Sequence, residues 1–246
     1  MGPESNPLVE IEIGDDPITW ASLGFTVGDD DVARVGRVGI RLAGAGDKRG
    51  RGILGWTLAT GAPAGDVDGL PTDYAVAPDD SRGADDGPVH AGPAPAPPPP
   101  PHPNGVVSID HIVVMTPDLD RTTEALGAVG LEARRTREAG GGRRQRFFRL
   151  GEVILEVVGP AAPAGDGPAT FWGLALTVAD IDATAAHLTG RIGAPKTAVQ
   201  NGRRIATLRA GDEVSVPIAV MSAAPPPGGG TGSSAERPGG AVGSDG

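Results

Sequence analysis

Several features are missing from this 246-residue sequence, and cysteine is the first of them. Without cysteine there can be no disulfide bond, thiol nucleophile or thiolate metal site. No apolar run approaches the roughly 18–20 residues that a membrane span needs. Residues 1–6 have neither the basic region nor the apolar core of a signal peptide. From these absences we expect a cytoplasmic protein.

Basic residues are also scarce, with 21 Lys and Arg against 31 Asp and Glu, for a net charge of −10. Nucleic acid and anionic membranes bind basic surfaces, so we expect neither as a partner. Residues 134–149 are the exception, because they hold seven arginines and one acid, Glu138. Guanidinium groups suit carboxylates and phosphates, so this patch either contributes to an anion site or is a solvated hairpin. The arginines are Arg134, Arg135, Arg137, Arg143, Arg144, Arg146 and Arg149.

Glycine and proline are abundant and unevenly spread. Together they make up about a quarter of the chain and concentrate at residues 78–105 and 222–246. The composition therefore predicts a loop and Pro-rich linker at 61–105 and a disordered tail at 223–246. Two folded regions remain, a shorter one at 8–60 and a larger one at 106–222.

The larger region contains an internal repeat. The strand Ser108–Met115 and the segment that follows it reappear 62 residues later, from Gly173 to Asp182. Each copy continues through a helix to a closing hairpin, and Gly-Arg-Arg precedes the hairpin in both copies, at Gly142 and Gly202. A repeat of this kind means one supersecondary unit used twice. We therefore expect an α+β fold of two βαβββ modules at residues 108–159 and 170–222.

A helix is expected directly after the first strand of each module. In the first module Thr116 is the candidate N-cap, with Pro117 at the first helical position. In the second module the helix is expected at residues 180–188.

Residues 8–60 show traces of the same unit. The segment 34–42 is similar to 149–157, and the segment 53–58 is similar to 171–176. We interpret this region as a partial copy of one module followed by the first strand of another.

The opening segment Ile109–Asp120 reads I-D-H-I-V-V-M-T-P-D-L-D, and residues 150–158 read L-G-E-V-I-L-E-V-V. Paired βαβββ units with these segments resemble the vicinal oxygen chelate superfamily. This superfamily includes glyoxalase I, extradiol dioxygenases, fosfomycin-modifying enzymes and bleomycin-binding resistance proteins. The resemblance implies curved sheets that enclose a cup and a divalent metal held by up to four side chains, two from each module.

The implied metal positions are only half filled in this chain. His111 and Glu156 occupy them in the first module, whereas Gly173 and Ala219 occupy them in the second. Catalytic zinc and non-haem iron sites usually have at least three protein ligands. We therefore expect no resident cofactor, unless a second chain in a homodimer completes a divalent metal site.

The leading functional hypothesis is a protein that binds a small organic molecule, an anionic one included, in the cup. The candidate ligand-binding residues are His111, Glu156, Arg149 and Trp172. His111 and Glu156 are either a satisfied polar contact or an acid–base pair. The alternatives are a metal-dependent lyase, isomerase or dioxygenase, with His111 and Glu156 as metal ligands, and a structural module that dimerises. Whether the chain is an enzyme stays open.

Overall fold

The structure is a computed structural model, and it describes residues 8–44, 50–59, 65–75, 101–209, 211 and 213–224. Most of the expected Pro-rich linker, and the expected disordered tail from residue 225, lie outside the described residues.

The C-terminal half forms an eight-stranded sheet in the order β12-β13-β14-β11-β7-β10-β9-β8. In both modules the first strand pairs in parallel with the last, β7 with β10 and β11 with β14, and the modules meet through antiparallel β7 and β11. The sequence prediction of two βαβββ modules is confirmed. The elements are β7 (Val106–Met115), α2 (Leu119–Ala128), β8 (Arg135–Gly140), β9 (Arg143–Leu150), β10 (Val153–Pro160), β11 (Thr170–Val178), α3 (Ile181–His187), β12 (Lys196–Thr197), β13 (Arg204–Thr207) and β14 (Ile218–Ser222).

The N-terminal half forms a six-stranded sheet in the order β2-β3-β1-β4-β6-β5. It repeats the pairing of the large sheet, since β1 is parallel to β3, β4 is parallel to β6, and β1 is antiparallel to β4. This confirms a partial N-terminal copy. The elements are β1 (Leu8–Ile13), α1 (Pro17–Ser22), β2 (Val32–Val35), β3 (Val38–Leu42), β4 (Ile53–Ala59), β5 (Gly65–Val67) and β6 (Leu70–Ala75).

The small sheet continues beyond the boundary expected at residue 60. Strands β5 and β6 lie in the segment that the composition predicted to be loop and linker. The short length of β5 and Pro71 near the start of β6 hid them, because proline is uncommon within sheets. Among the described elements, the second half of the small sheet therefore has three strands and no helix.

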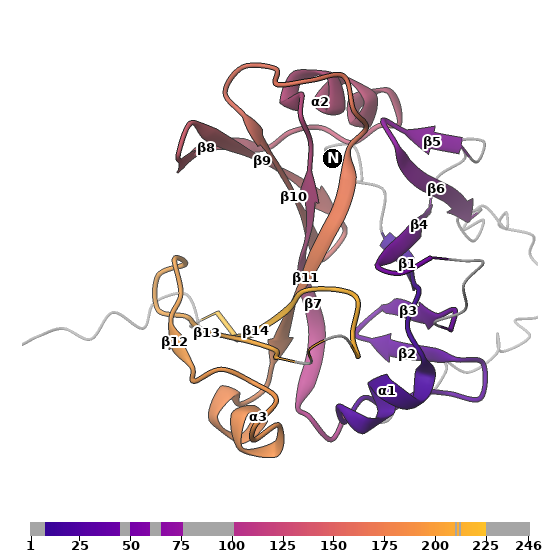
Figure 1. Cartoon of the computed structure of the whole chain (residues 1–246), viewed down its shortest axis with the longest axis vertical. Helices are drawn as coiled ribbons and strands as arrows, with labels where there is room; N and C mark the ends of the chain where they lie inside the picture. Colours follow the sequence, from indigo (N-terminus) through magenta and orange to yellow (C-terminus); the bar gives the residue numbers. More distant parts are fainter. Residues whose placement is uncertain are drawn as a thin grey trace, which may run out of the picture.

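The two sheets pack back to back around one apolar core (Figure 1). In the large sheet, alternate residues such as Ile112 and Val114 are buried in that core, and in the small sheet Ile11 and Ile13 are buried in it too. Side chains alternate across a strand, so the residues between them point to the outer faces. The β8–β9 hairpin and the β12–β13 strands bend away from the small sheet, and this curvature makes the cup (Figure 1).

Carboxylates outside the cup join the two halves. Asp15 is buried after β1 and accepts hydrogen bonds from Trp20 Nε1, at 3.1 Å, and from the backbone N–H of Ser215, at 3.0 Å. Asp68, in the turn between β5 and β6, pairs with Arg121 at 2.7 Å and accepts a hydrogen bond from the Thr122 hydroxyl. The small sheet is thereby fixed to both modules of the large one.

Helix α2 begins two residues later than the sequence predicted. Its N-cap is Asp118, whose carboxylate accepts the N–H groups of Asp120 and Arg121 at 3.0 Å. The Thr116 hydroxyl instead accepts the N–H of Asp118, also at 3.0 Å. A carboxylate is the stronger acceptor and also interacts favourably with the helix dipole, which explains the later start. Across the described residues, no helix is long and apolar enough to cross a membrane.

Candidate functional site

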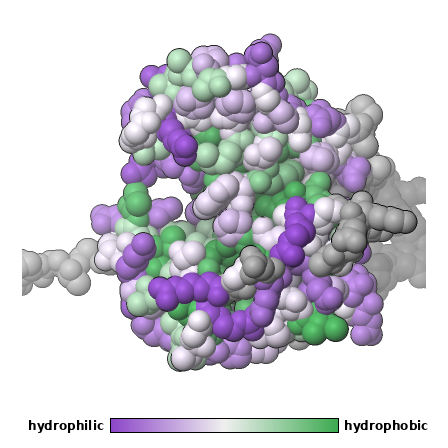
Figure 2. Space-filling model, viewed as in Figure 1, coloured by the Kyte–Doolittle hydropathy of each residue, from purple (hydrophilic) through white to green (hydrophobic). Residues whose placement is uncertain are grey.

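A cavity of about 470 Å³ lies on the concave face of the large sheet, against strands from both modules. In the space-filling view the surface is hollowed between two lobes (Figure 2). The lining is mostly apolar, with five side chains that carry a polar group, namely those of His111, Arg143, Glu156, Trp172 and Thr207. It comprises His111, Val113, Met115, Arg143, Glu156, Val158, Trp172, Leu174, Ala175, Ile205, Thr207, Pro217, Ile218 and Ala219.

His111 is oriented by its neighbour in the chain. A β-bulge in β7 lets Ala175 and Leu176 pair with His111 and Ile109, so that Asp110 is the extra residue. The bulge allows Asp110 to reach back to His111, whose Nδ1 lies 2.8 Å from Asp110 Oδ2. A carboxylate can only accept, so Nδ1 carries a proton and donates to Asp110. His111 is therefore held in a fixed orientation at the cavity wall, with Nε2 turned toward Glu156.

Asp110 is itself held by a cation from the other module. Arg203 donates to Asp110 Oδ1 at 2.6 Å and to the Ser222 carbonyl at 2.7 Å. Burial alone would raise the pKa of Asp110, but the hydrogen bonds from His111 and Arg203 outweigh it and bring the pKa below its usual 3.8. Asp110 is thus ionised at neutral pH, which keeps a proton on His111 Nδ1 and fixes the orientation of the ring.

Glu156 faces His111 from the neighbouring strand without a direct hydrogen bond. The His111 Nε2 and Glu156 Oε2 atoms are 3.9 Å apart, which exceeds hydrogen-bond distance. The Glu156 carboxylate accepts from Gln145 Nε2 at 2.6 Å. Burial raises the pKa of Glu156 above its usual 4.5, while His111, Arg137 and Gln145 partly oppose this shift. A ligand atom between His111 and Glu156 would contact both.

The structure brings three of the four sequence-predicted residues together. His111, Glu156 and Trp172 line the same cavity, and the Trp172 side chain is 54 % exposed there. Arg149 lies on the concave face outside this lining, and its guanidinium donates to the Gly151 carbonyl at 3.4 Å. Arg143, from the same arginine-rich segment, is the arginine among the residues that line the cavity.

Sequence reasoning missed Asp110, Gln145 and Arg203 as parts of the site. Regular alternation places Asp110 and His111 on opposite faces of β7, and only the bulge changes this. The Gly-Arg-Arg motif marked Arg203 as part of the repeat but did not indicate its contact with the first module. Gln145 faces Glu156 through the pairing of β9 with β10, a register that the hairpin about Gly151 could have revealed.

The residues of the cup do not fit a complete metal site. Ala219 lies in the cavity lining, at one of the two second-module positions, and has no donor atom. At Gly173, a Cβ atom would lie 2.6 Å from the Pro217 carbonyl oxygen. Within the described part of the chain, no three His, Asp or Glu side chains are grouped to hold a metal ion. His111 and Glu156 alone are fewer than the usual ligands.

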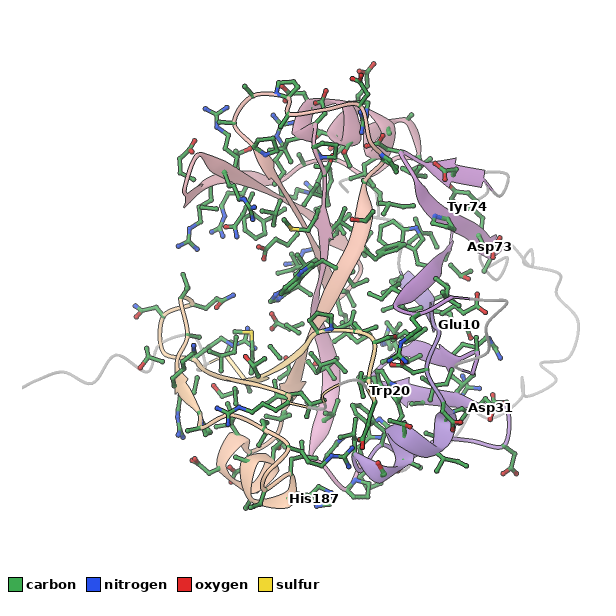
Figure 3. All side chains as sticks on the ribbon, in the orientation of Figure 1. Glu10, Trp20, Asp31, Asp73, Tyr74 and His187 are labelled. Atoms are coloured by element: carbon green, nitrogen blue, oxygen red, sulfur yellow. The ribbon has the colours of Figure 1, made fainter. Side chains whose placement is uncertain are left out.

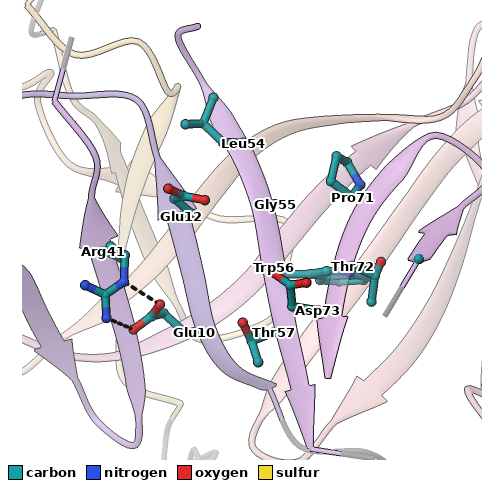
Figure 4. Close-up of a pocket in the computed structure, with 11 residues that line it drawn as sticks. Glu10, Glu12, Arg41, Leu54, Gly55, Trp56, Thr57, Pro71, Thr72 and Asp73 are labelled. Carbon is teal, nitrogen blue, oxygen red and sulfur yellow. Dashed lines mark hydrogen bonds and ion pairs between the residues drawn. The ribbon is translucent and has the colours of Figure 1, made fainter. Parts of the chain in front are cut away.

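The small sheet carries a counterpart of this site on its own outer face. Glu10 pairs in register with Gly39 and Glu12 with Arg41, just as His111 pairs with Ile154 and Val113 with Glu156. Glu10 and Arg41 therefore occupy the places of His111 and Glu156, where they form a two-point ion pair at 2.7 and 3.0 Å (Figure 4).

Two further positions correspond in the same way. A Cβ atom on Gly55 would lie 3.0 Å from the Pro71 carbonyl oxygen, as one on Gly173 would approach Pro217. Asp73 then takes the place of Ala219, and Glu10 and Asp73 lie on the side of the small sheet away from the large one (Figure 3). A cavity of about 380 Å³ lies over these residues. The partial copy thus keeps the geometry of the site with different side chains.

One family model matches a part of the chain that lies in the large sheet. A family model described as Glyoxalase/Bleomycin resistance protein/Dioxygenase superfamily matches residues 108–198. The solved structures that the chain is similar to include methylmalonyl-CoA epimerase from Mycobacterium tuberculosis, at 19% identity and a TM-score of 0.40, over 49% of this chain and 91% of that one.

They also include a variant of Streptomyces coelicolor methylmalonyl-CoA epimerase in complex with 2-nitronate-propionyl-CoA. It is 25% identical over 48% of this chain and 96% of that one, with a TM-score of 0.39. No curated protein matches the chain. The match to residues 108–198, together with the paired βαβββ modules, shows that the chain carries a domain of the Glyoxalase/Bleomycin resistance protein/Dioxygenase superfamily.

Proposed function

We propose that the chain binds a small organic anion in the cup of the large sheet. The observation that carries this proposal is the lining of the cavity, which combines mostly apolar side chains with Arg143 and the His111–Glu156 pair. Small-molecule sites commonly combine such walls with a few polar groups that orient the ligand. The apolar part of the ligand would lie against β11 and β14 beside Trp172.

The two polar ends of the cavity suit different parts of one molecule. Arg143 pairs across the sheet with Pro160, which lies four residues after Glu156 on β10, or about 13 Å along the strand. No ion pair of Arg143 with a described carboxylate is present, so its guanidinium is available to an anionic group. Arg203, by contrast, is already paired with Asp110 and is not available to a ligand. The anionic group therefore belongs at Arg143, and a hydrogen-bonding group belongs between His111 and Glu156.

Tryptophan fluorescence can test the proposal, because Trp20 and Trp56 are buried and Trp172 is exposed. We would titrate the protein with aromatic carboxylates and, for each skeleton, with its neutral amide and its amine. We expect saturable binding of carboxylates, weakened about tenfold by Arg143→Ala, since a hydrogen bond between charged groups contributes on the order of 1.5–3 kcal/mol. Arg149→Ala is the matched control and should leave the affinity within about twofold.

Equal affinity for carboxylates and amines, or equal losses in both arginine variants, would contradict the assignment. Trp172→Phe should remove the optical signal and leave binding detectable by calorimetry.

The metal-dependent alternative is tested on the same protein. His111 has the second hydrogen bond, to Asp110, that metal-binding histidines usually have. Metal analysis of the wild type and of His111→Ala, together with the molecular mass in solution, distinguishes the two functions. A stoichiometric metal lost in His111→Ala would replace the binding-only function with a metal site completed by another chain.

A further inference from the structure

The edge of the large sheet at β8 is unlike the rest of the molecule. All six residues of β8 are exposed, and the strand pairs with β9 on one side only. It belongs to the arginine-rich segment 134–149, in a chain whose net charge is −10. An edge strand presents unpaired N–H and C=O groups that another strand can pair with.

The charges on this edge are arranged by the register of the sheet. Arg135 pairs with Phe147 and Arg137 with Gln145, and these two β9 residues pair in turn with Glu156 and Val158. Since Glu156 and Val158 line the cavity, Arg135 and Arg137 point to the same concave face. They are two residues apart, which is the repeat of a strand.

The charges on the opposite face are largely matched. Glu138 pairs with Arg144 at 2.9 Å, and Arg146 pairs with Asp120 at 2.6 Å. Arg135 and Arg137 form none of the ion pairs found among the described residues, and Arg137 acts on Glu156 only through its charge, which lowers the pKa of that carboxyl. The Arg135 guanidinium instead lies 4.8 Å from the centre of the Phe147 ring. The excess positive charge of the edge is therefore on its concave side.

We propose that β8 is a docking edge for an extended acidic segment of another protein, which adds to the large sheet as a further strand. Backbone hydrogen bonds to β8 would supply affinity, and acidic side chains at alternate positions of the segment would lie beside Arg135 and Arg137. A second copy of β8 fits poorly, because antiparallel or parallel pairing would bring an arginine-rich strand against another one.

The test uses the full chain and a fluorescent peptide of about eight residues that alternates glutamate and valine. Fluorescence anisotropy should show one-to-one binding. Arg137→Glu should weaken it at least about tenfold, whereas Arg209→Glu, an exposed arginine outside the segment, should change it less than about twofold. The same peptide with N-methyl groups on alternate backbone amides should not bind, because strand pairing needs those donors. A lysine–valine peptide should bind Arg137→Glu more tightly than wild type.

Three results would overturn the proposal. One is an absence of binding at low ionic strength. Another is equal binding of the N-methylated peptide, or of an oligothymidylate of matched charge, which would mean that the segment attracts any polyanion. The last is self-association of the chain that Arg137→Glu abolishes, since a second copy would then occupy the edge.

Discussion

At the level of single residues, buried polar groups hold this molecule together more than its exposed ion pairs. Asp15 illustrates this, because it is 1 % exposed and serves donors from two distant parts of the chain. The exposed pair of Arg34 with Asp30 is four residues apart and contributes little to stability.

We expect Asp15→Ala to lower the free energy of unfolding by about 2–4 kcal/mol, because Trp20 Nε1 and the Ser215 N–H would lose a buried acceptor. Urea denaturation monitored by circular dichroism measures this change. Asp29→Ala, at an exposed position in the turn before β2, should stay within about 0.5 kcal/mol of the wild type. Similar values for both variants would mean that Asp15 does not join the two halves.

At the level of the elements, strand β11 is shaped by its closeness to the segment before β14. The Gly173 position has no room for a side chain without a backbone shift, since a Cβ atom there would lie 2.6 Å from the Pro217 carbonyl oxygen. The same closeness at Gly55 and Pro71 shows that it belongs to the repeated unit.

Gly173→Ala is expected to destabilise the protein by about 1–3 kcal/mol, through overpacking against backbone, and by more than Gly55→Ala. Gly127→Ala, in α2, should have the opposite sign and stabilise by about 0.5–1 kcal/mol, because a Cβ there meets no atom within 4 Å. Denaturation curves of the three variants rank the effects, and a neutral Gly173→Ala would refute this account. For the same reason, Gly173→His should not create a metal site.

Some of the elements could be predicted from the sequence, whereas some of the contacts between them could not. The offset of 62 residues placed both modules, and the similarity of 34–42 to 149–157 located the β2–β3 hairpin. The β7 bulge could not be predicted, because it is a local departure from the alternation of side chains along a strand. The contact of Arg203 with Asp110 could not be predicted either, because it joins two modules. His111 and Glu156 were named from a motif, whereas Asp110 and Arg143 needed the three-dimensional register.

At the level of the whole molecule, His102 lies near the end of the segment predicted as linker, where it is buried and contacts the N-terminal half. Its Nδ1 accepts the N–H of Thr26 at 2.9 Å, and its Nε2 lies 3.1 Å from the Arg34 carbonyl oxygen. These contacts require a neutral ring with the proton on Nε2. Burial lowers the pKa of His102 below its usual 6.5, against a smaller opposing effect of the Arg34 carbonyl.

This histidine should make the protein less stable in mild acid. The unfolded chain takes up a proton at His102 near pH 6.5, before the folded chain does, so its contribution is complete above that pH and is lost as the pH falls through the lower folded value. We expect the free energy of unfolding to fall less steeply between about pH 7 and 5 in His102→Gln than in the wild type. Urea titrations at constant ionic strength measure both slopes, and identical slopes would show that the ring is not held neutral.

Because the sheets pack back to back, alternate residues of the same strand have different roles. Residues such as Ile112 and Val114 hold the halves together, while Val113 between them faces the cup. If the cup binds a ligand as proposed, mutations at Val113, Ile205 or Ala219 should therefore change which ligand binds, with little effect on the shared core. Libraries restricted to such alternate positions should yield many folded variants with changed ligand preference, whereas libraries at the intervening positions should yield few.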